Sequence, residues 1–359
     1  LLLGAMASFA NSEEPKGLQQ SLIPIDTFSR DVKYHSLKLS PNGDYLGVMT
    51  KQEGKDVLII LDTKEFKMHH GVRFPGNAQV GEYHWVNDER VVLGKEYLRG
   101  WQEHPQYHGE LFGVNVDGSR GKYLVGYQGE QQIGSRTKKA TPLYGTSYVL
   151  DPLHHDEDKM LVVTYPWTSS NEPHTIVYEV DVYRGTRKKV LRSPSRMAQF
   201  LTDEQGEVRV SVSTDSSSYQ KVHIRNLERD EWQELQSEDM DLSDIRLHGF
   251  NAKGDIVYAS ASTRGEPSGL YKLNLDTKEY ELVYREENVS PSKVWVDDVH
   301  KSVFAIEYEA QYPTYAFVDA QASMSKRLKG MLEAIPGRQV RIVSSTKDGN
   351  MSVVWAGSD

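Results

Sequence analysis

The pentapeptide Gly145-Thr146-Ser147-Tyr148-Val149 is the stretch nearest to a hydrolase nucleophile motif. The serine of an α/β-hydrolase sits in Gly-x-Ser-x-Gly, because the sharp strand-to-helix turn needs small flanking residues. Here the second glycine is missing, bulky residues follow the serine, and a strand-like run comes next. Strands do not alternate with long helices after it, as a hydrolase sheet requires. The sequence therefore predicts no catalytic residue in this chain.

Metal-binding and cofactor motifs are also missing from the sequence. The chain has no cysteine, which excludes thiolate nucleophiles, disulfides and Cys-ligated zinc. The dense run His154-His155-Asp156-Glu157-Asp158 is interpreted as a solvated turn, and His69-His70 would point to opposite faces of a strand. No helical His-Glu-x-x-His and no Gly-rich phosphate loop occurs. We therefore expect neither a metal nor a cofactor.

The charge balance argues against a nucleic-acid partner. The 359 residues include 42 Lys and Arg against 51 Asp and Glu, which gives a formal charge of −9. A nucleic-acid binder usually carries a basic face or stripe. The basic clusters here, 184–189 and 326–329, are short and are interpreted as solvated faces.

The first ten residues, LLLGAMASFA, form an apolar run that ends in small residues. This pattern is typical of the end of a secretory signal peptide. We interpret residues 1–10 as a signal-peptide remnant and 11–22 as an N-terminal extension, with a scar from cloning as the alternative. No later apolar run reaches the ~18 residues of a membrane span. The sequence thus predicts a periplasmic or secreted protein.

A turn rich in Asp, Asn and Gly, followed by a short β-rich run, recurs along the chain. The first strand residue after each turn is Tyr45, Val91, Met160, Val208, Ile256, Val303 and Met351. The successive spacings are 46, 69, 48, 48, 47 and 48 residues. This period is expected for the four-stranded blades of a β-propeller. The one long spacing is attributed to an inserted loop over 94–109 and a polar stretch over 126–142.

Most turns are followed by alternating strands that end in further turns. Examples are 57–66, 111–118, 176–182 and 270–279, where period-2 alternation runs into Asp-Thr-Lys or Asp-Gly. A single four-stranded sheet exposes both faces, so blades must pack side by side around an axis. The sequence therefore predicts an all-β fold over residues 23–359, a propeller of about seven antiparallel blades.

Two features distinguish the end of the chain. Apolar residues at helical spacing, stopped by Pro336-Gly337, predict one helix over about 320–335, inserted between the sixth and seventh blades. The last repeat, 338–359, supplies only two strands of the four that a blade needs. The seventh blade is therefore expected to be incomplete, and the chain to be a truncated fragment.

Three segments resemble the propeller domains of bacterial prolyl oligopeptidase-family serine peptidases. They are Ile23-Pro24-Ile25-Asp26-Thr27-Phe28-Ser29-Arg30 with the following 37–46, then 268–277, and finally 343–349 with 355–359. Each segment is moderately specific, whereas their order and spacing together are more so. The resemblance covers nearly the whole chain from Ile23 onward.

The resemblance implies that this chain is one domain of a longer polypeptide. In that family the propeller precedes an α/β-hydrolase domain with a Ser-Asp-His triad, caps its active site and restricts access to peptides. The expected partners are thus a C-terminal hydrolase domain of the same polypeptide and a peptide substrate. Propeller residues of related peptidases can hold a peptide terminus by charge-assisted contacts. The candidates here are Arg264, Glu307 and Glu309, charged residues near strand ends.

Two other functions stay open at this point. A self-standing periplasmic propeller that serves as a protein-binding scaffold is the main alternative to a peptidase cap. A propeller enzyme such as a glycosidase or lyase would need paired carboxylates, for which Glu307 and Glu309 are available, but such pairs depend on a spatial separation that sequence does not supply.

Overall fold

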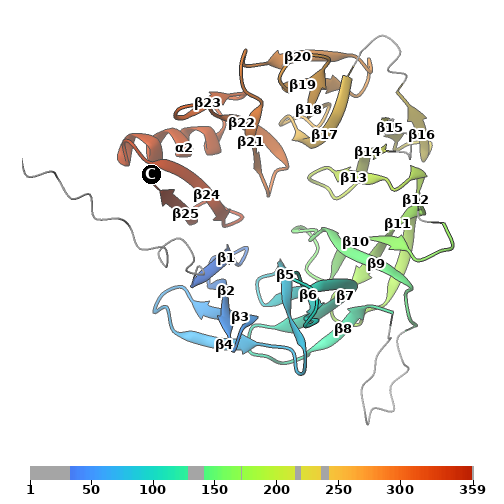
Figure 1. Ribbon diagram of the computed structural model, residues 1–359, viewed down its shortest axis with the longest axis vertical. Coiled ribbons are helices and arrows are strands. Elements are labelled where there is room, and N and C mark those ends of the chain that lie inside the picture. The colour runs from blue at the N-terminus through green and yellow to red at the C-terminus, as the bar shows by residue number, and fades with distance from the viewer. Residues whose placement is uncertain (1–32, 128–140, 171, 215–219, 236–241, 358–359) are drawn as a thin grey trace, which may run out of the picture. The chain divides into compact units, whose positions relative to one another are not determined.

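The strands of the computed structural model follow one another as small antiparallel sheets around a common centre (Figure 1). The structure describes residues 33–127, 141–170, 172–214, 220–235 and 242–357. The proposed signal remnant (1–10), the extension (11–22) and the segment Ile23–Arg30 lie outside the described residues. Residues Tyr34–Asp359 form one compact unit.

Each of the first four blades is a four-stranded antiparallel sheet with its strands in chain order. Blade 1 holds β1 (Tyr34–Leu39), β2 (Tyr45–Gln52), β3 (Lys55–Asp62) and β4 (Met68–Val72). Blade 2 holds β5 (Ala78–Asn87), β6 (Arg90–Tyr97), β7 (Gln106–Asn115) and β8 (Lys122–Val125). Blade 3 holds β9 (Gly145–Asp151), β10 (Lys159–Pro166), β11 (His174–Asp181) and β12 (Arg187–Arg196). Blade 4 holds β13 (Gln199–Thr202), β14 (Val208–Thr214), β15 (Gln220–Asn226) and β16 (Glu231–Glu234).

The last three blades depart from this regular pattern. Blade 5 holds β17 (Leu242–Phe250), β18 (Ile256–Thr263), β19 (Gly269–Asn274) and β20 (Tyr280–Tyr284). Blade 6 holds three strands, β21 (Pro291–Asp297), β22 (Ser302–Glu309) and β23 (Pro313–Phe317). A parallel bridge between Phe250 and Ser302 joins blades 5 and 6 into one seven-stranded sheet. Blade 7 holds β24 (Gln339–Ser345) and β25 (Ser352–Gly357).

The predicted repeat is confirmed strand by strand. All seven residues that anchor the repeat lie within one residue of the start of the second strand of a blade. The insertion expected over 94–109 is shorter than predicted, because β6 and β7 stay paired as far as Tyr97 and Gln106. Only 98–105 form the connecting loop, so part of the long spacing is longer strands.

The hydrophobic core is divided among the interfaces between neighbouring blades. Blades 1 and 2 enclose Leu58, Ile60, Tyr83 and Trp85, all nearly inaccessible to solvent. Similar clusters join each further pair of neighbours, and Leu39 packs near Val353 between blades 1 and 7. Because both faces of a blade are covered in this way, its strands carry longer apolar runs than a half-exposed sheet would.

The predicted helix is present as α2 (Ser323–Ala334) between blades 6 and 7. Just before the helix, the Asp319 carboxylate accepts hydrogen bonds from the N–H groups of Gln321 and Ala322. Met324 and Leu328 are buried against Trp295 and Phe304. The helix therefore packs beside the three-stranded blade 6 (Figure 1). No described helix has the length and apolar character needed to cross a membrane.

Blade 7 lies against blade 1 through side-chain and loop contacts. The Leu39 N–H donates to Ser344 Oγ at 3.0 Å, and the Lys347 N–H donates to the Pro41 carbonyl at 2.8 Å. These contacts are at the ends of β1 and β24, where each strand turns into the next. Tyr34 and Gly357 are at the other ends of β1 and β25. The start of β1 and the end of β25 therefore lie on the face opposite to these turns.

Candidate functional site

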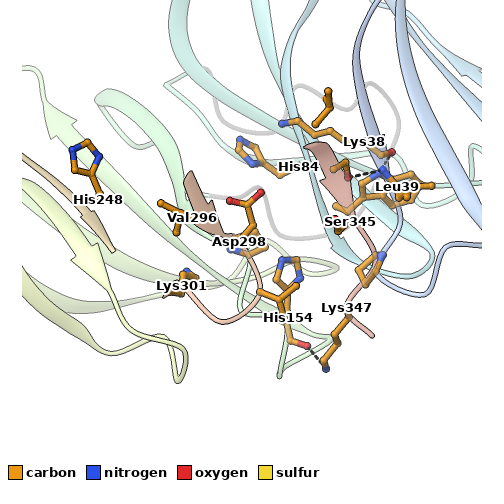
Figure 2. Close-up of a pocket in the computed structure, with 16 residues that line it drawn as sticks. Lys38, Leu39, His84, His154, His248, Val296, Asp298, Lys301, Ser345 and Lys347 are labelled. Atoms are coloured by element: carbon orange, nitrogen blue, oxygen red, sulfur yellow. Dashed lines mark hydrogen bonds between the residues drawn. The ribbon is translucent and has the colours of Figure 1, made fainter. Parts of the chain in front are cut away.

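A cavity of about 460 Å³ opens at the face formed by the turns that follow the first strand of each blade (Figure 2). Six of the seven blades contribute to its wall. The lining residues are Lys38, Leu39, Pro41, His84, Trp85, Pro152, His154, His248, Val296, Asp298, Val299, Lys301, Val343, Ser344, Ser345 and Lys347. Because these residues come from six blades around the centre, the cavity lies at the turn end of the central axis and is called the mouth.

Two further cavities, of about 190 and 420 Å³, extend this mouth along the inner strands. His84 lines both the mouth and the first of them, whereas Lys38 and Val343 line both the mouth and the second. Glu82 and Glu96 are common to the two deeper cavities. The three cavities thus lie next to one another along β1 and β5, from the turn face inward.

Two imidazoles in the wall are held in their neutral form. Burial lowers the pKa of His84 to about 3, with a further contribution from the Lys38 ammonium. Burial also lowers the pKa of His248 to about 4, and its Nε2 lies 2.8 Å from Ser260 Oγ. A neutral imidazole offers one donor and one acceptor. The wall can therefore hydrogen-bond a peptide group at neutral pH without adding positive charge.

Lys38 and Asp298 are charged groups inside the mouth. The Lys38 ammonium donates to the Tyr83 carbonyl at 2.7 Å and lies 3.8 Å from Glu82 Oε1. Burial lowers the pKa of Lys38, and burial together with the neighbouring Asp297 raises the pKa of Asp298. The Asp298 carboxylate projects into the open space between Lys38 and His154 (Figure 2). Both groups are thus shifted toward their neutral forms by the surrounding protein.

Lys301 crosses the mouth from blade 6. Its ammonium donates to Asp151 Oδ2 at 2.6 Å and to Thr202 Oγ1 at 3.2 Å. Asp151 ends β9 in blade 3, and Thr202 ends β13 in blade 4. Burial alone would raise the pKa of Asp151, but the Lys301 ammonium and the hydrogen bonds to the carboxylate hold it below its usual value. This side of the mouth is therefore closed by a buried ion pair.

His154 and Lys347 form a second contact across the mouth. The Lys347 ammonium donates to the His154 carbonyl at 3.0 Å and so joins blade 7 to blade 3. The His154 Nδ1 is buried and has no hydrogen-bond partner in the structure. Burial lowers the pKa of His154. Within the described ranges, no group of three His, Asp or Glu side chains is placed to hold a metal ion.

Comparison with solved structures identifies the fold. The apo form of prolyl oligopeptidase B from Galerina marginata matches 88% of this chain and 46% of its own length, with a TM-score of 0.51 and 11% identity. The same protein bound to a 25mer macrocyclization substrate matches 79% and 42%, also at 0.51 and 11%. The chain thus shares the β-propeller fold found in prolyl oligopeptidase. At this identity the likeness concerns the fold.

Other comparisons add no stronger relationship. Dipeptidyl peptidase 4 of Porphyromonas gingivalis matches 90% of the chain with a TM-score of 0.49 and 10% identity. The chain spans about half the length of that peptidase, 50%, and 48% of the acylaminoacyl peptidase of Pyrococcus horikoshii. No protein-family model matches the sequence, and no curated protein is significantly similar to it.

The three residues proposed to touch substrate lie away from the mouth. Arg264 is exposed in the turn between β18 and β19, and Glu309 is exposed at the end of β22. Glu307 is fully buried, and its carboxylate accepts from Gln339 Nε2 at 2.6 Å and from Trp295 Nε1 at 3.2 Å. None of the three belongs to the residues that line the mouth. Their role in substrate binding stays a prediction.

The serine of the hydrolase-like pentapeptide is structural. Ser147 is fully buried in β9, and its hydroxyl lies 2.9 Å from Thr164 Oγ1 of the neighbouring strand. It is therefore neither on a strand-to-helix turn nor open to a substrate. His69 and His70 are consecutive in β4, where His69 is exposed and packs against Tyr45, with ring centroids 5.2 Å apart.

The residues of the mouth carry a positional signal that sequence reasoning did not use. Five of them precede the anchor of their repeat by five to eight positions: Lys38 before Tyr45, His84 before Val91, His154 before Met160, His248 before Ile256 and Asp298 before Val303. These positions lie within three residues of the end of the first strand of a blade. A polar residue that recurs in this stretch of five repeats marks candidates for the site, whereas their convergence depends on how the blades are arranged.

Proposed function

We propose that this chain is the non-catalytic propeller domain of an exported serine peptidase and that it caps and gates the active site of the peptidase. The observation that carries the proposal is the mouth itself, a channel opening built by six blades and lined by lysine, histidine and aspartate side chains. The propeller fold shared with prolyl oligopeptidase B supports it. The burial of Ser147 is consistent with a catalytic serine that lies in another domain of the polypeptide.

The direction of the strands supports a particular arrangement of this cap. Tyr34 and Gly357 are at the face opposite to the mouth. Two further strands that complete blade 7 would run to the mouth face and back, so a hydrolase domain after them would lie nearest to that opposite face. The mouth would then face solvent, and a peptide would pass along β1 and β5 to reach the active site. Neutral His84 and His248 would contact its backbone on the way.

Two measurements test this function. The pure chain is expected to show no turnover of chromogenic peptides and no labelling by a fluorophosphonate, a serine-directed reagent. In the complete polypeptide, Val299→Trp should narrow the mouth and lower kcat/KM for oligopeptides more than for a dipeptide substrate. Leu227→Trp, a change at an exposed position, is the matched control. Turnover by the chain alone, or an equal effect of the two tryptophans on long peptides, would overturn the proposal.

A further inference from the structure

The turn between β21 and β22, residues 298–301, connects blade 6 by hydrogen bonds to blades on the far side of the mouth. Lys301 reaches Asp151 of blade 3 and Thr202 of blade 4. The neighbouring His300 Nδ1 lies 2.8 Å from Glu204 Oε1, just after the end of β13. Regular propeller contacts join adjacent blades, whereas these contacts pass over blade 5.

The turn is also anchored to blade 5, which is next to it. The Phe250 N–H of blade 5 donates to the Lys301 carbonyl at 2.7 Å. Lys301 has a φ of +56°, a left-handed conformation that costs energy for a residue with a Cβ. In this conformation the Lys301 carbonyl accepts a hydrogen bond from blade 5, while the side chain reaches across to blade 3. The residue thus joins two parts of the wall that no strand ladder joins.

The receiving carboxylate is deeply buried. The Asp151 side chain is 3% exposed and that of Lys301 20%. Asp151 also accepts from the Leu153 N–H and from Thr202 Oγ1. A buried pair that is satisfied in this way persists only while both partners stay in place, because a buried charge without a partner is unfavourable. Loss of either partner is therefore expected to be costly.

We propose that the β21–β22 turn is a latch across the channel mouth and that Lys301 determines how wide the mouth opens. With the ion pair made, blades 3 and 6 are held together and the mouth keeps its cavity of about 460 Å³. With the pair broken, the two sides separate and longer or bulkier peptides enter. Lys301 is then a specificity-determining residue of the channel. Its meaning for peptide selection rests on the proposed function, whereas the latch does not.

The latch is tested on the full chain by distance measurement between two spin labels. The chain has no native cysteine, so Glu157→Cys and Lys253→Cys provide a unique pair of labels. Both positions are exposed on the mouth face, in the turns after β9 and β17. Pulsed electron–electron double resonance then measures the distance between the label on blade 3 and the label on blade 5. Blade 5 is joined to blade 6 by the Phe250–Ser302 bridge.

Lys301→Met is expected to shift the distance distribution to longer values and to broaden it. The single variant leaves the Asp151 carboxylate buried without its partner. The double variant Asp151→Asn with Lys301→Met removes both charges, so that no unpaired charge stays at this position. It should show the same shift. Lys221→Met, which breaks an ion pair within blade 4, is the matched control and should leave the distribution unchanged. An unchanged distribution in the folded double variant would overturn the latch.

A second measurement separates the latch from the proposed function. In the complete polypeptide, Lys301→Met should raise the ratio of kcat/KM for long peptides to that for dipeptides, and Lys221→Met should not. Turnover with an unchanged ratio would overturn the role of Lys301 in selection. No turnover by the parent polypeptide would overturn the proposed function instead, and the spin-label result would still decide the latch.

Discussion

Lys301 Nζ lies 2.6 Å from Asp151 Oδ2 although the two residues are 150 positions apart in the sequence and belong to blades that are not neighbours. The short contacts that build each blade are between strands close in sequence. The pair therefore connects parts of the wall that the repeat itself leaves unconnected. Its strength decides both the stability of the mouth and its width.

Replacing Lys301 by methionine should lower the free energy of unfolding by about 3–5 kcal/mol, because it leaves a buried carboxylate without its partner. Chemical denaturation at neutral pH measures the loss. The double variant with Asp151→Asn should recover most of it, since a neutral amide can still bond Thr202. A loss of less than about 1 kcal/mol, the size expected of a surface pair, would show that the pair is solvated.

The contact between His300 and Glu204 should make stability depend on pH near neutrality. The hydrogen bond to Glu204 raises the pKa of His300 above its ordinary value of 6.5. A raised pKa means that the stabilising contribution is complete below the ordinary value and is lost as pH rises through the folded value. The denaturation midpoint should therefore decrease as the pH is raised from about 6 to about 8. His300→Gln should remove this dependence of the midpoint on pH. An identical slope in the variant would contradict the assignment.

Glu307 is expected to matter for stability more than Glu309 does. Glu307→Gln leaves one of the two donors, Gln339 and Trp295, without an acceptor in a fully buried site. This should cost about 1–3 kcal/mol. Glu309→Gln, two residues along the same strand and exposed, should stay within about 0.5 kcal/mol. Thermal and chemical denaturation compare them, and equal effects would mean that the Glu307 contacts are not maintained.

Two glycines with left-handed backbones separate conformational strain from steric contact. Gly109 has a φ of +82°, and a Cβ there would clash with the Ser147 backbone nitrogen. Gly254 has a φ of +74° and open space around it. Gly254→Ala should cost about 1–2 kcal/mol from strain alone, and Gly109→Ala should cost about 1–3 kcal/mol more from the clash with β9. Denaturation curves that place the two variants together would contradict the close approach of blades 2 and 3.

The repeat could be predicted because its signal is local. Tyr45, Val208 and Ile256 each follow a turn and begin a strand, and these patterns depend on residues only a few positions away. The mouth could not be predicted in the same way. His84, His248 and Lys301 belong to three different blades, and their convergence depends on how the blades are arranged around the centre.

Burial was the second quantity that sequence patterns did not supply. Glu307 and Glu309 have the same charge and lie on the same strand, yet one is fully buried between blades 6 and 7 and the other is exposed. The difference comes from Gln339 and Trp295, which the sequence does not place beside Glu307. His154 shows the reverse case, because a turn interpreted as solvated carries a side chain that lines the mouth.

The contacts across the mouth also bear on the order in which the molecule folds. Each blade closes short loops, which cost little chain entropy, whereas the Lys301–Asp151 pair and the Leu39–Ser344 hydrogen bond span 150 and 305 residues. Because the loop-closure entropy of such long-range contacts is large, we expect them to form late, after the local hairpins. Changes at Lys301 should therefore act mainly on the unfolding rate and little on the folding rate. The mouth is in this sense the last part of the wall to assemble and the first to come apart.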